Sequence, residues 1–323
     1  MPRLHSSNNP GKWNEDRGPN RAAIFWKGIP MERHNTFWRV ALLAPPLTVF
    51  AVFVIWPLLS SFFYSVTNWN GFGSDYDFVG LDNFARIFTD KLFMNAAINT
   101  TIWMIAAIVV PTLCGLALAL LLDGKVPGGR AFKTVFYLPI CLSAVIVGQI
   151  WIWIYQPDWG LLNTVVSNIS GEKIRYAWLA KPDTALGSVI LAWSWQQTGL
   201  SMVIYLAGLT AIPEDLLEVC EIEGAKLWQR IIFVVLPLLT PSTVVVIALS
   251  VINSLKGFDI LYIMTGGGPF NSSDTLAMHM YNESFRKYLM GYGSAISVVL
   301  FLIALTIIGI YFRQLKKVDR IYG

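Results

Sequence analysis

The sequence predicts an all-α, polytopic membrane protein with six transmembrane helices, and two observations indicate this fold class. Hydrophobic residues make up 55% of the 323 residues and charged residues only 14%, with a mean hydropathy of +0.54. Soluble domains rarely combine so few charges with so much apolar surface. In addition, six long gaps separate the charged residues, and each gap is longer than the ~20 residues that a helix needs to cross a hydrocarbon core.

The six gaps place the spans along the chain, within a membrane domain that extends over 37–318. The 36 residues before it are mostly polar and rich in Arg, Asn, Pro and Gly, which predicts a disordered cytoplasmic tail over 1–36 and argues against a secretory leader. A short tail follows at 319–323, and the sequence leaves open whether Met1 or Met31 is the true start. The spans are expected at about 40–66, 95–122, 134–157, 184–213, 231–255 and 288–312.

Lys and Arg residues are distributed unequally between the two sides of the membrane. An even number of spans puts both termini on one side, together with the loops 123–133 and 214–230. These loops and the two tails hold sixteen of the 24 Lys and Arg residues, and such an excess is typical of the cytoplasmic side. The sequence therefore predicts cytoplasmic N- and C-termini (N-in/C-in) in a multi-pass membrane protein, and the family resemblance described below implies the bacterial cytoplasmic (inner) membrane.

The spans lack the residues that would drive transport or catalysis. The six gaps contain no Asp, Glu, Lys, Arg or His, although carriers driven by protons or sodium generally keep such groups at membrane depth. The stretch GGRAFKT (128–134) lacks the glycine and the spacing of a phosphate-binding loop. The chain also has no nucleophile–base pair and no metal-ligand cluster with usable spacing. We therefore expect no catalytic residue, no metal site and no cofactor in this chain, and a partner must supply the energy for any uphill movement.

One cytoplasmic loop, over 214–230, has an unusual charge pattern. Leu216 and Cys220 have helical spacing, Gly224 can take the left-handed conformation that ends a helix, and the next helix begins near Leu227. The loop carries five acidic residues, whereas helices that lie on the anionic inner leaflet are usually rich in Lys and Arg. An interfacial helix on lipid is the alternative, but an acidic bracket with a Gly-Ala step better matches a groove in a partner protein.

The segment EVCEIEGAKLWQRIIFVVLP (218–237) resembles the EAA loop of ATP-binding-cassette (ABC) importer permeases. The positions that are fixed in that loop are occupied here by Glu218, Gly224, Ala225, Leu236 and Pro237. Departures from the pattern stand at Val219, Cys220, Glu223 and Ile231. Further segments, at 138–163, 209–218, 258–273 and 292–301, resemble carbohydrate-importer permeases, including those for maltose and glycerol-3-phosphate, so that the resemblance covers about 37–318.

This resemblance implies a permease domain that forms half of a heterodimeric pore with a second, different permease subunit. It also implies two cytoplasmic ATPase subunits, which bind the ATP and Mg, and an extracytoplasmic solute-binding protein. Each ATPase would hold one such loop and move it as a lever, so that the pore alternates between its two openings. The implied ATPase-coupling residues are Glu218, Glu221, Glu223, Gly224, Ala225, Trp228 and Pro237. Membrane lipid is the other expected partner, and no basic-aromatic patch indicates nucleic acid.

Two polar clusters within the fourth and fifth spans are candidates for contact with the solute. Tryptophan faces can pack on a sugar ring, and amide or hydroxyl groups can exchange hydrogen bonds with its hydroxyls. If the fifth helix starts at Pro237 and runs past Lys256, its cluster lies near the middle of that helix. The same residues can instead hydrogen-bond neighbouring helices or anchor an interface. The candidates are Trp193, Trp195, Gln196, Gln197, Ser250, Asn253 and Ser254.

The stretch TGGGP (265–269) is expected to form a flexible turn on the outer side. One interpretation of this turn is contact with the solute-binding protein through Gly266, Gly267, Gly268 and Pro269. The other is that it is only a tight reversal of the chain.

Two other functions of the protein stay open. An ion-coupled carrier could bind sodium through backbone carbonyls, and its uptake would survive inactivation of the ATPase. A non-transporting scaffold would recruit a cytoplasmic protein, and replacing Gln196 and Gln197 would not change uptake. The sequence does not name the solute.

Overall fold

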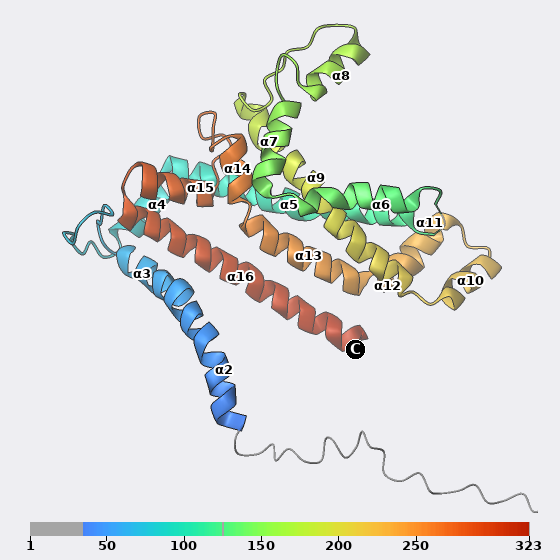
Figure 1. Ribbon diagram of the computed structural model, residues 1–323, viewed down its shortest axis with the longest axis horizontal. Helices are drawn as coiled ribbons and strands as arrows, with labels where there is room; N and C mark the ends of the chain where they lie inside the picture. The colour runs from blue at the N-terminus through green and yellow to red at the C-terminus, as the bar shows by residue number, and fades with distance from the viewer. Residues whose placement is uncertain (1–34, 125, 323) are drawn as a thin grey trace, which may run out of the picture. The chain divides into compact units, whose positions relative to one another are not determined.

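The computed structural model describes residues 35–124 and 126–322, which contain helices and loops but no strand. Figure 1 shows the helices in chain order. The chain divides into two compact units, 1–59 and 60–323. All but the last two residues of the predicted tail 1–36 lie outside the described residues.

The described part of the first unit belongs to one apolar helix. α2 (Asn35–Phe50) passes through a π-helical turn, η1 (Ala51–Ile55), into α3 (Trp56–Tyr64). Over Val40–Tyr64 the hydropathy reaches 2.2, and none of the most apolar stretch is buried. A helix that is hydrophobic on all sides needs lipid or another protein around it.

The second unit includes the last residues of α3, and after a loop it continues with α4 (Asp82–Thr89) and the long α5 (Lys91–Leu122). Asp90 separates the two helices and caps α5, because its Oδ1 accepts hydrogen bonds from the backbone N–H of Leu92 (2.8 Å) and of the following residue (3.4 Å). The cap fixes where α5 starts.

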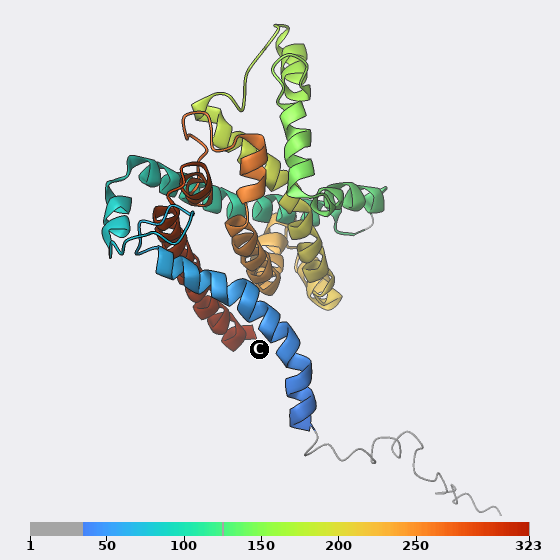
Figure 2. The same cartoon turned by 60° about the vertical axis from the view of Figure 1, so that its left-hand side comes forward.

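α5 packs along the other long helix, α9 (Pro182–Thr210), and the two form the centre of this unit. Their approach depends on a glycine. A Cβ at Gly115 would lie 2.4 Å from Cβ of Ser201 and 2.8 Å from the backbone nitrogen of Met202, so that any other residue would push the helices apart. Figure 2 shows the unit from a second direction.

Between α5 and α9 the chain forms a broken helix and a hairpin. α6 (Gly129–Tyr137) continues into a proline-containing 3₁₀ turn, η2 (Leu138–Cys141), after which the chain turns by 108° into α7 (Ala144–Ile154). The predicted span 134–157 is therefore two helical segments with a sharp bend. α8 (Leu161–Ser170) then forms the tip of a hairpin (Figure 1).

A second broken helix follows α9 and the loop over 214–230. A π-helical turn, η3 (Ile231–Val235), and α12 (Leu236–Leu238) lead through a bend of 67° into α13 (Thr240–Leu255). α14 (Phe258–Met264) comes directly after it.

α13 ends at Leu255 and does not run past Lys256, so the condition under which the polar cluster would lie near the middle of the fifth helix is not met. The indole ring of Trp103 occupies the space beside the chain here, and a Cβ at Gly257 would lie 2.4 Å from its Cζ2 atom. The backbone can only make this approach at a glycine, and α13 ends just before it. Asn253 and Ser254 therefore lie in the last turn of α13 rather than near the middle of a longer helix.

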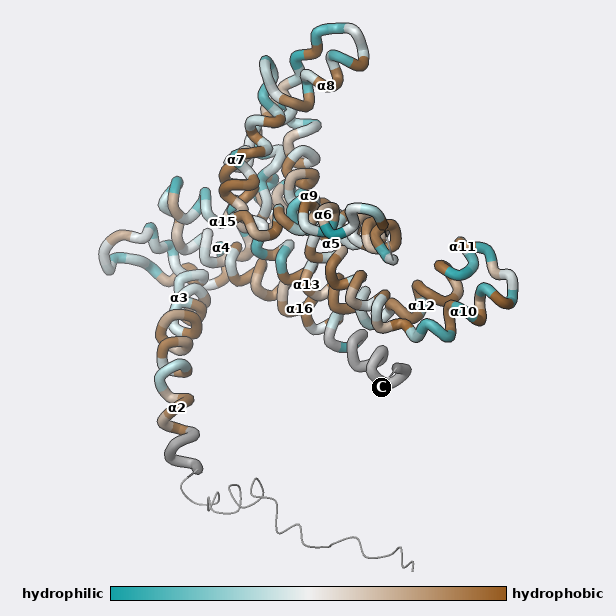
Figure 3. Tube along the Cα trace, turned by 45° about the vertical axis from the view of Figure 1, so that its right-hand side comes forward, coloured by the Kyte–Doolittle hydropathy of each residue, from teal (hydrophilic) through white to brown (hydrophobic). Residues whose placement is uncertain are grey.

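The chain ends with α15 (Leu276–Tyr281), the π-helical turn η4 (Asn282–Arg286) and the long α16 (Met290–Tyr322). α16 runs beside α13 in both views (Figures 1 and 2). Hydrophobic residues follow both helices, whereas hydrophilic residues gather on the connecting loops (Figure 3).

Three described helices are long and apolar enough to cross a membrane, judged by length and composition: Val40–Tyr64, Lys91–Leu122 and Met290–Tyr311. The number rises to as many as six if each of three bent helix pairs is one span. The all-α class agrees with the structure over the described residues. Six spans and the N-in/C-in orientation stay predictions.

Candidate functional site

The loop that follows α9 forms a helical bracket. α10 (Glu214–Ile222) ends in a Schellman motif, in which Gly224 N–H donates to the Glu221 carbonyl (3.1 Å) and Ala225 N–H donates to the Cys220 carbonyl (3.0 Å). Gly224 has φ +72°, the left-handed conformation that the sequence predicts. The reversal of the chain at Gly224 therefore follows from the hydrogen bonds and the backbone conformation of this loop itself.

The second arm of the bracket is α11 (Leu227–Arg230), and two contacts fix it. The Gln229 side chain accepts a hydrogen bond from the Lys226 backbone N–H (2.8 Å), which caps the helix. Arg230 donates to the Glu221 carboxylate across the reversal (2.9 Å). Because Glu221 is largely exposed, this ion pair orients the two arms but adds little to stability.

The outer surface of the bracket carries both acidic and apolar side chains. Glu218 and Glu223 are exposed and form no salt bridge within the described part of the chain. Ile222 is 85% exposed and Trp228 is 54% exposed. Apart from Gly224 itself and its two chain neighbours, no heavy atom of the described residues lies within 4 Å of the place where a Cβ of Gly224 would stand. The predicted coupling residues thus form an open surface, with Pro237 set apart in α12.

A polar pair joins α9 and α13 inside the second unit. Asn253 Nδ2 donates to Gln197 Oε1 (3.2 Å), and both side chains line a small cleft together with Ser250 and Ser201. Gln197, Ser201 and Ser250 are buried, and three of the seven predicted solute residues, Gln197, Ser250 and Asn253, meet at this cleft. Amides and hydroxyls in such a cleft can donate and accept hydrogen bonds.

Gln196 has a structural partner. Its Nε2 donates to the Leu142 carbonyl at the break between η2 and α7 (2.8 Å), while its buried Oε1 has no partner among the described residues. The amide nitrogen of Gln196 therefore ties α9 to the bend between η2 and α7, whereas the amide oxygen has no hydrogen-bond partner among the described residues.

The two predicted tryptophans point in different directions. Trp193 is buried in a hydrophobic core and packs against Trp103 with ring centroids 5.4 Å apart. Trp195 is 39% exposed, contacts Trp151 (5.9 Å) and lines an apolar groove on another side of α9. They do not form one platform, because positions i and i+2 of a helix face away from each other.

Trp103 also supports the end of α13. Its Nε1 donates to the Ser254 carbonyl (3.0 Å), which also accepts the backbone N–H of Gly257 (3.2 Å) at the end of the helix. The hydroxyl of Ser254 turns back to the Val251 carbonyl (2.8 Å). Ser254 is thus fully engaged within this chain, unlike Asn253.

The loop 265–276 is tied to α5, which corrects the expectation of a flexible turn. Asn99 Nδ2 donates to the carbonyls of Ser272 (3.1 Å) and Asp274 (2.9 Å), and Asn95 Nδ2 donates to the Asn271 carbonyl (2.7 Å). Within the loop, Ser273 Oγ donates to the Gly268 carbonyl (2.6 Å) and is fully buried. The hydrogen bonds to α5 therefore anchor the loop that contains the predicted docking glycines and proline. Phe270 of the same loop is 91% exposed.

Four titratable side chains lie close together beside this loop, and three of them, Asp274, His279 and Glu283, are buried. Nδ1 of His279 lies 3.3 Å from Asp274, and its Nε2 lies 3.8 Å from Asp90 and 4.0 Å from Glu283. Burial raises the pKa of the Asp274 carboxyl above its ordinary value. Burial would also raise the pKa of Asp90, but hydrogen bonds from Tyr292 and from two backbone N–H groups hold it below the ordinary value. The cluster binds the loop, α5 and α15 together.

Trp103, Asn99, Phe270 and His279 are the contributors that sequence reasoning missed. The polar run in 95–101, inside an otherwise apolar span, is the signal that would have found Asn99. Neither Phe270 nor Trp103 has a comparable signal, since both lie among many aromatic residues.

Comparison with known proteins gives consistent matches. The chain matches the family model described as binding-protein-dependent transport system inner membrane component over residues 112–318. It is 35% identical to a probable ABC transporter permease protein of Pyrococcus horikoshii, over 83% of this chain and 92% of the relative. A probable starch degradation products transport system permease protein of Thermoanaerobacterium thermosulfurigenes is 32% identical, over 88% and 97%.

One solved structure supports the fold. A chain of the bacterial alginate ABC transporter, in complex with an alginate pentasaccharide-bound periplasmic protein, matches with a TM-score of 0.76 at 22% identity. The match covers 87% of this chain and 95% of that chain.

Proposed function

Because the chain belongs to the family of binding-protein-dependent transport system inner membrane components, we propose that it is the permease subunit of an ATP-driven importer for a sugar or a sugar-like solute. It forms half of a heterodimeric pore in the bacterial inner membrane, with a second, different permease as the other half. The names of the starch-product and alginate relatives support the sugar class.

The bracket of α10 and α11 carries this proposal. Its open surface combines the carboxylates of Glu218 and Glu223, which form no salt bridge among the described residues, with exposed apolar side chains at Ile222 and Trp228. Lipid headgroups of the inner leaflet repel such a surface, whereas a protein groove can accept it. Each of two cytoplasmic ATPase subunits would hold one bracket of this kind, bind the ATP and Mg, and move the bracket as a lever.

The solute would pass the cleft of Gln197 and Asn253, and the second permease would complete the site. An extracytoplasmic solute-binding protein would deliver the solute at the loop 265–276, where Phe270 is the exposed contact. This chain itself needs no cofactor, since the ATPase subunits supply the energy.

The test uses the complete transporter, reconstituted in proteoliposomes from both permeases, the ATPase and the binding protein. The double variant Glu218→Arg, Gly224→Leu should lose co-purification with the ATPase while it still inserts and pairs with the second permease. Unchanged co-purification would refute the docking role of the bracket. Solute accumulation that continues with an inactive ATPase but stops without an ion gradient would select a secondary carrier instead.

A further inference from the structure

α4 lies beside one end of each of the three described helices that are long and apolar enough to cross a membrane. Its Asn83 Nδ2 donates to the carbonyls of Ser65 (2.9 Å) and Thr67 (2.8 Å), just beyond the end of α3. α5 begins directly after α4, with a single capping residue between them. The guanidinium of Arg86 lies 4.1 Å from the ring centre of Tyr292, in the first turn of α16. α4 is therefore at the level where these helices would leave the hydrocarbon core.

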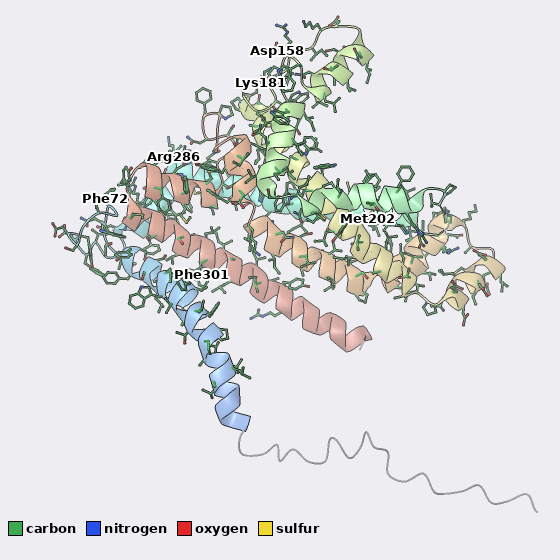
Figure 4. The ribbon with its side chains drawn as sticks, in the orientation of Figure 1. Phe72, Asp158, Lys181, Met202, Arg286 and Phe301 are labelled. Carbon is green, nitrogen blue, oxygen red and sulfur yellow. The ribbon has the colours of Figure 1, made fainter. Side chains whose placement is uncertain are left out.

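Aromatic side chains at the end of α3 indicate the same level. Tyr64 and Trp69 stack with ring centroids 4.1 Å apart. The ring centroid of Tyr76 lies 6.1 Å from that of Tyr64 and 6.0 Å from that of Phe63. The loop that carries Trp69 and Tyr76 also contains Phe72, which is labelled in Figure 4. Tyr and Trp are enriched where a membrane meets water, because their rings are apolar and their O–H or N–H groups are polar. This aromatic group thus marks the headgroup region beside α4.

Two of the three sides of α4 are accounted for by core packing and by polar side chains. Ile87 is 2% exposed and lies in a hydrophobic core with Ile296 of α16. The polar side consists of exposed residues spaced by four and by three positions, which share one side of a helix. These residues are Asp82, Arg86 and Thr89. α4 is therefore fixed on the second unit by one side and exposes polar groups on another.

The third side of α4 is apolar and exposed. Leu81, at the N-cap, is 72% exposed, Phe88 is 80% exposed, and Ala85 lies between them on the same side. Phe78 is 74% exposed and lies close to the same turn, because a Cβ at Gly80 would stand 3.9 Å from its Cε1 atom. We call Phe78, Leu81, Ala85 and Phe88 the α4 apolar face. Single exposed apolar side chains are ordinary, but a group of large ones marks a contact surface.

Apolar exposure continues along the chain from α4 into the first turns of α5. Leu92, Met94 and Ile98 are 40%, 52% and 60% exposed. The α4 apolar face itself carries no charge. A helix at headgroup level, with one side apolar and another polar, has the pattern of helices that lie in the membrane interface. Acyl chains just below the headgroups can cover such a face without any charged partner.

A soluble binding protein and the second permease match this face less well. A soluble protein docks and leaves, so Phe78, Leu81 and Phe88 would stand in water between encounters. Helices within a membrane approach each other closely through small residues, whereas these three side chains are large. Lipid also accounts for the aromatic group at the end of α3, which neither protein partner explains.

We propose that the α4 apolar face inserts into the outer leaflet of the membrane, where it contacts the acyl chains of phospholipids just below their headgroups. Asn83 and Arg86 join α4 to the ends of α3 and α16, so this contact would fix the depth of both helices in the membrane. The assignment to the outer leaflet rests on the proposed function and on the N-in/C-in orientation. The contact with lipid requires only that the three helices span a membrane.

The test identifies what touches Phe88 by photo-crosslinking in the complete transporter. Phe88→benzoylphenylalanine places a photoreactive ring on the α4 apolar face, and Thr89→benzoylphenylalanine places it on the exposed polar side one residue further along. Both transporters are reconstituted in vesicles of dioleoyl phosphatidylethanolamine and dioleoyl phosphatidylglycerol, irradiated and analysed by mass spectrometry. We expect chains that carry one phospholipid to be about fivefold more frequent with the Phe88 variant, because interfacial helices bury only their apolar side in lipid.

Further substitutions test whether the α4 apolar face acts as a unit. In the Phe88→benzoylphenylalanine chain, Phe78→Gln together with Leu81→Gln should lower the lipid adduct severalfold, because two of the large side chains that hold the face in lipid are gone. Asp82→Asn, on the polar side, is the control and should leave the adduct unchanged. All these side chains are exposed, so the recovery of the assembled transporter should not change.

Three results would overturn the proposed lipid contact. These are a main crosslink from the Phe88 variant to the second permease or to the binding protein, equal lipid adducts in the Phe88 and Thr89 variants, or no lipid adduct in the Phe88 variant. Sugar uptake by the parent transporter would leave the proposed function intact in each case. Conversely, a lipid adduct confined to the Phe88 variant of a transporter that moves no sugar contradicts the proposed function and supports the lipid contact.

Discussion

The side chains of Gln197 and Asn253 share a hydrogen bond of 3.2 Å across the cleft between α9 and α13. Two roles are compatible with this contact. A pair that only holds two helices together can be replaced by apolar side chains of similar size at little cost. A pair that also exchanges hydrogen bonds with a solute cannot be replaced in this way.

We expect the double variant Gln197→Leu, Asn253→Leu to lower the uptake rate about tenfold, since losing one or two hydrogen bonds of about 1 kcal/mol each weakens solute contact by this amount. Uptake into proteoliposomes measures it, and assembly with the ATPase should stay unchanged. Thr198→Val is the control, because the Thr198 hydroxyl bonds only within its own helix, to the Ser194 carbonyl. A normal uptake rate in the double variant would assign the pair to helix packing alone.

The bracket should require glycine at position 224 because of the left-handed backbone conformation there. Alanine at φ +72° costs about 1 kcal/mol, which reduces the population of the intact bracket roughly fivefold. We therefore expect Gly224→Ala to weaken co-purification with the ATPase, and Gly224→Asn to retain most of it, because asparagine tolerates the left-handed region. Gly309→Ala, in the open middle of α16, is the matched control.

The volume beside Gly224 is open, so a second result of this experiment is also informative. If the alanine and asparagine variants lose the ATPase equally, the ATPase itself occupies the open volume beside Gly224, and the close approach rather than the turn is what requires glycine.

Local signals in the sequence predicted much of this structure. Uncharged gaps located the long helices. Gly224 after an amphipathic stretch predicted a helix end in the left-handed conformation, and this was possible because all the hydrogen bonds of the Schellman motif found there lie within six residues. The family resemblance is confirmed by the match over 112–318.

Contacts between distant residues could not be predicted. The end of α13 depends on Trp103 filling the space beside Gly257, more than 150 residues away in the chain. The anchoring of the loop 265–276 likewise depends on Asn99 of α5. The separation of Trp193 from Trp195 follows from which side of α9 the other helices cover, and a single helix pattern does not contain that information.

Asn99 should be needed for the response to the binding protein. Leucine has a similar size, but it would leave the carbonyls of Ser272 and Asp274 without a donor, which costs about 1 to 3 kcal/mol for each buried group. We expect Asn99→Leu to reduce the stimulation of ATP hydrolysis by liganded binding protein severalfold and to leave the basal rate unchanged. Thr101→Val is the control, because Thr101 bonds only to the Ala97 carbonyl one turn back. Full stimulation of the Asn99 variant would mean that the loop needs no frame for docking.

The part of the second unit around Asp90, where α4, α5 and α16 meet, should lose stability in acid. Hydrogen bonds from Tyr292 and from backbone N–H groups hold the pKa of Asp90 below the ordinary 3.8, so the folded chain favours the charged form. This contribution is present above the ordinary pKa and is lost as the pH falls through the lower folded value. We expect the thermal unfolding midpoint of the parent in detergent to drop more steeply below about pH 4 than that of Asp90→Asn, which should be less stable at pH 7. The exposed Asp75→Asn is the control, and parallel curves for the parent and Asp90→Asn would show that the cap and Tyr292 do not select the charged carboxylate.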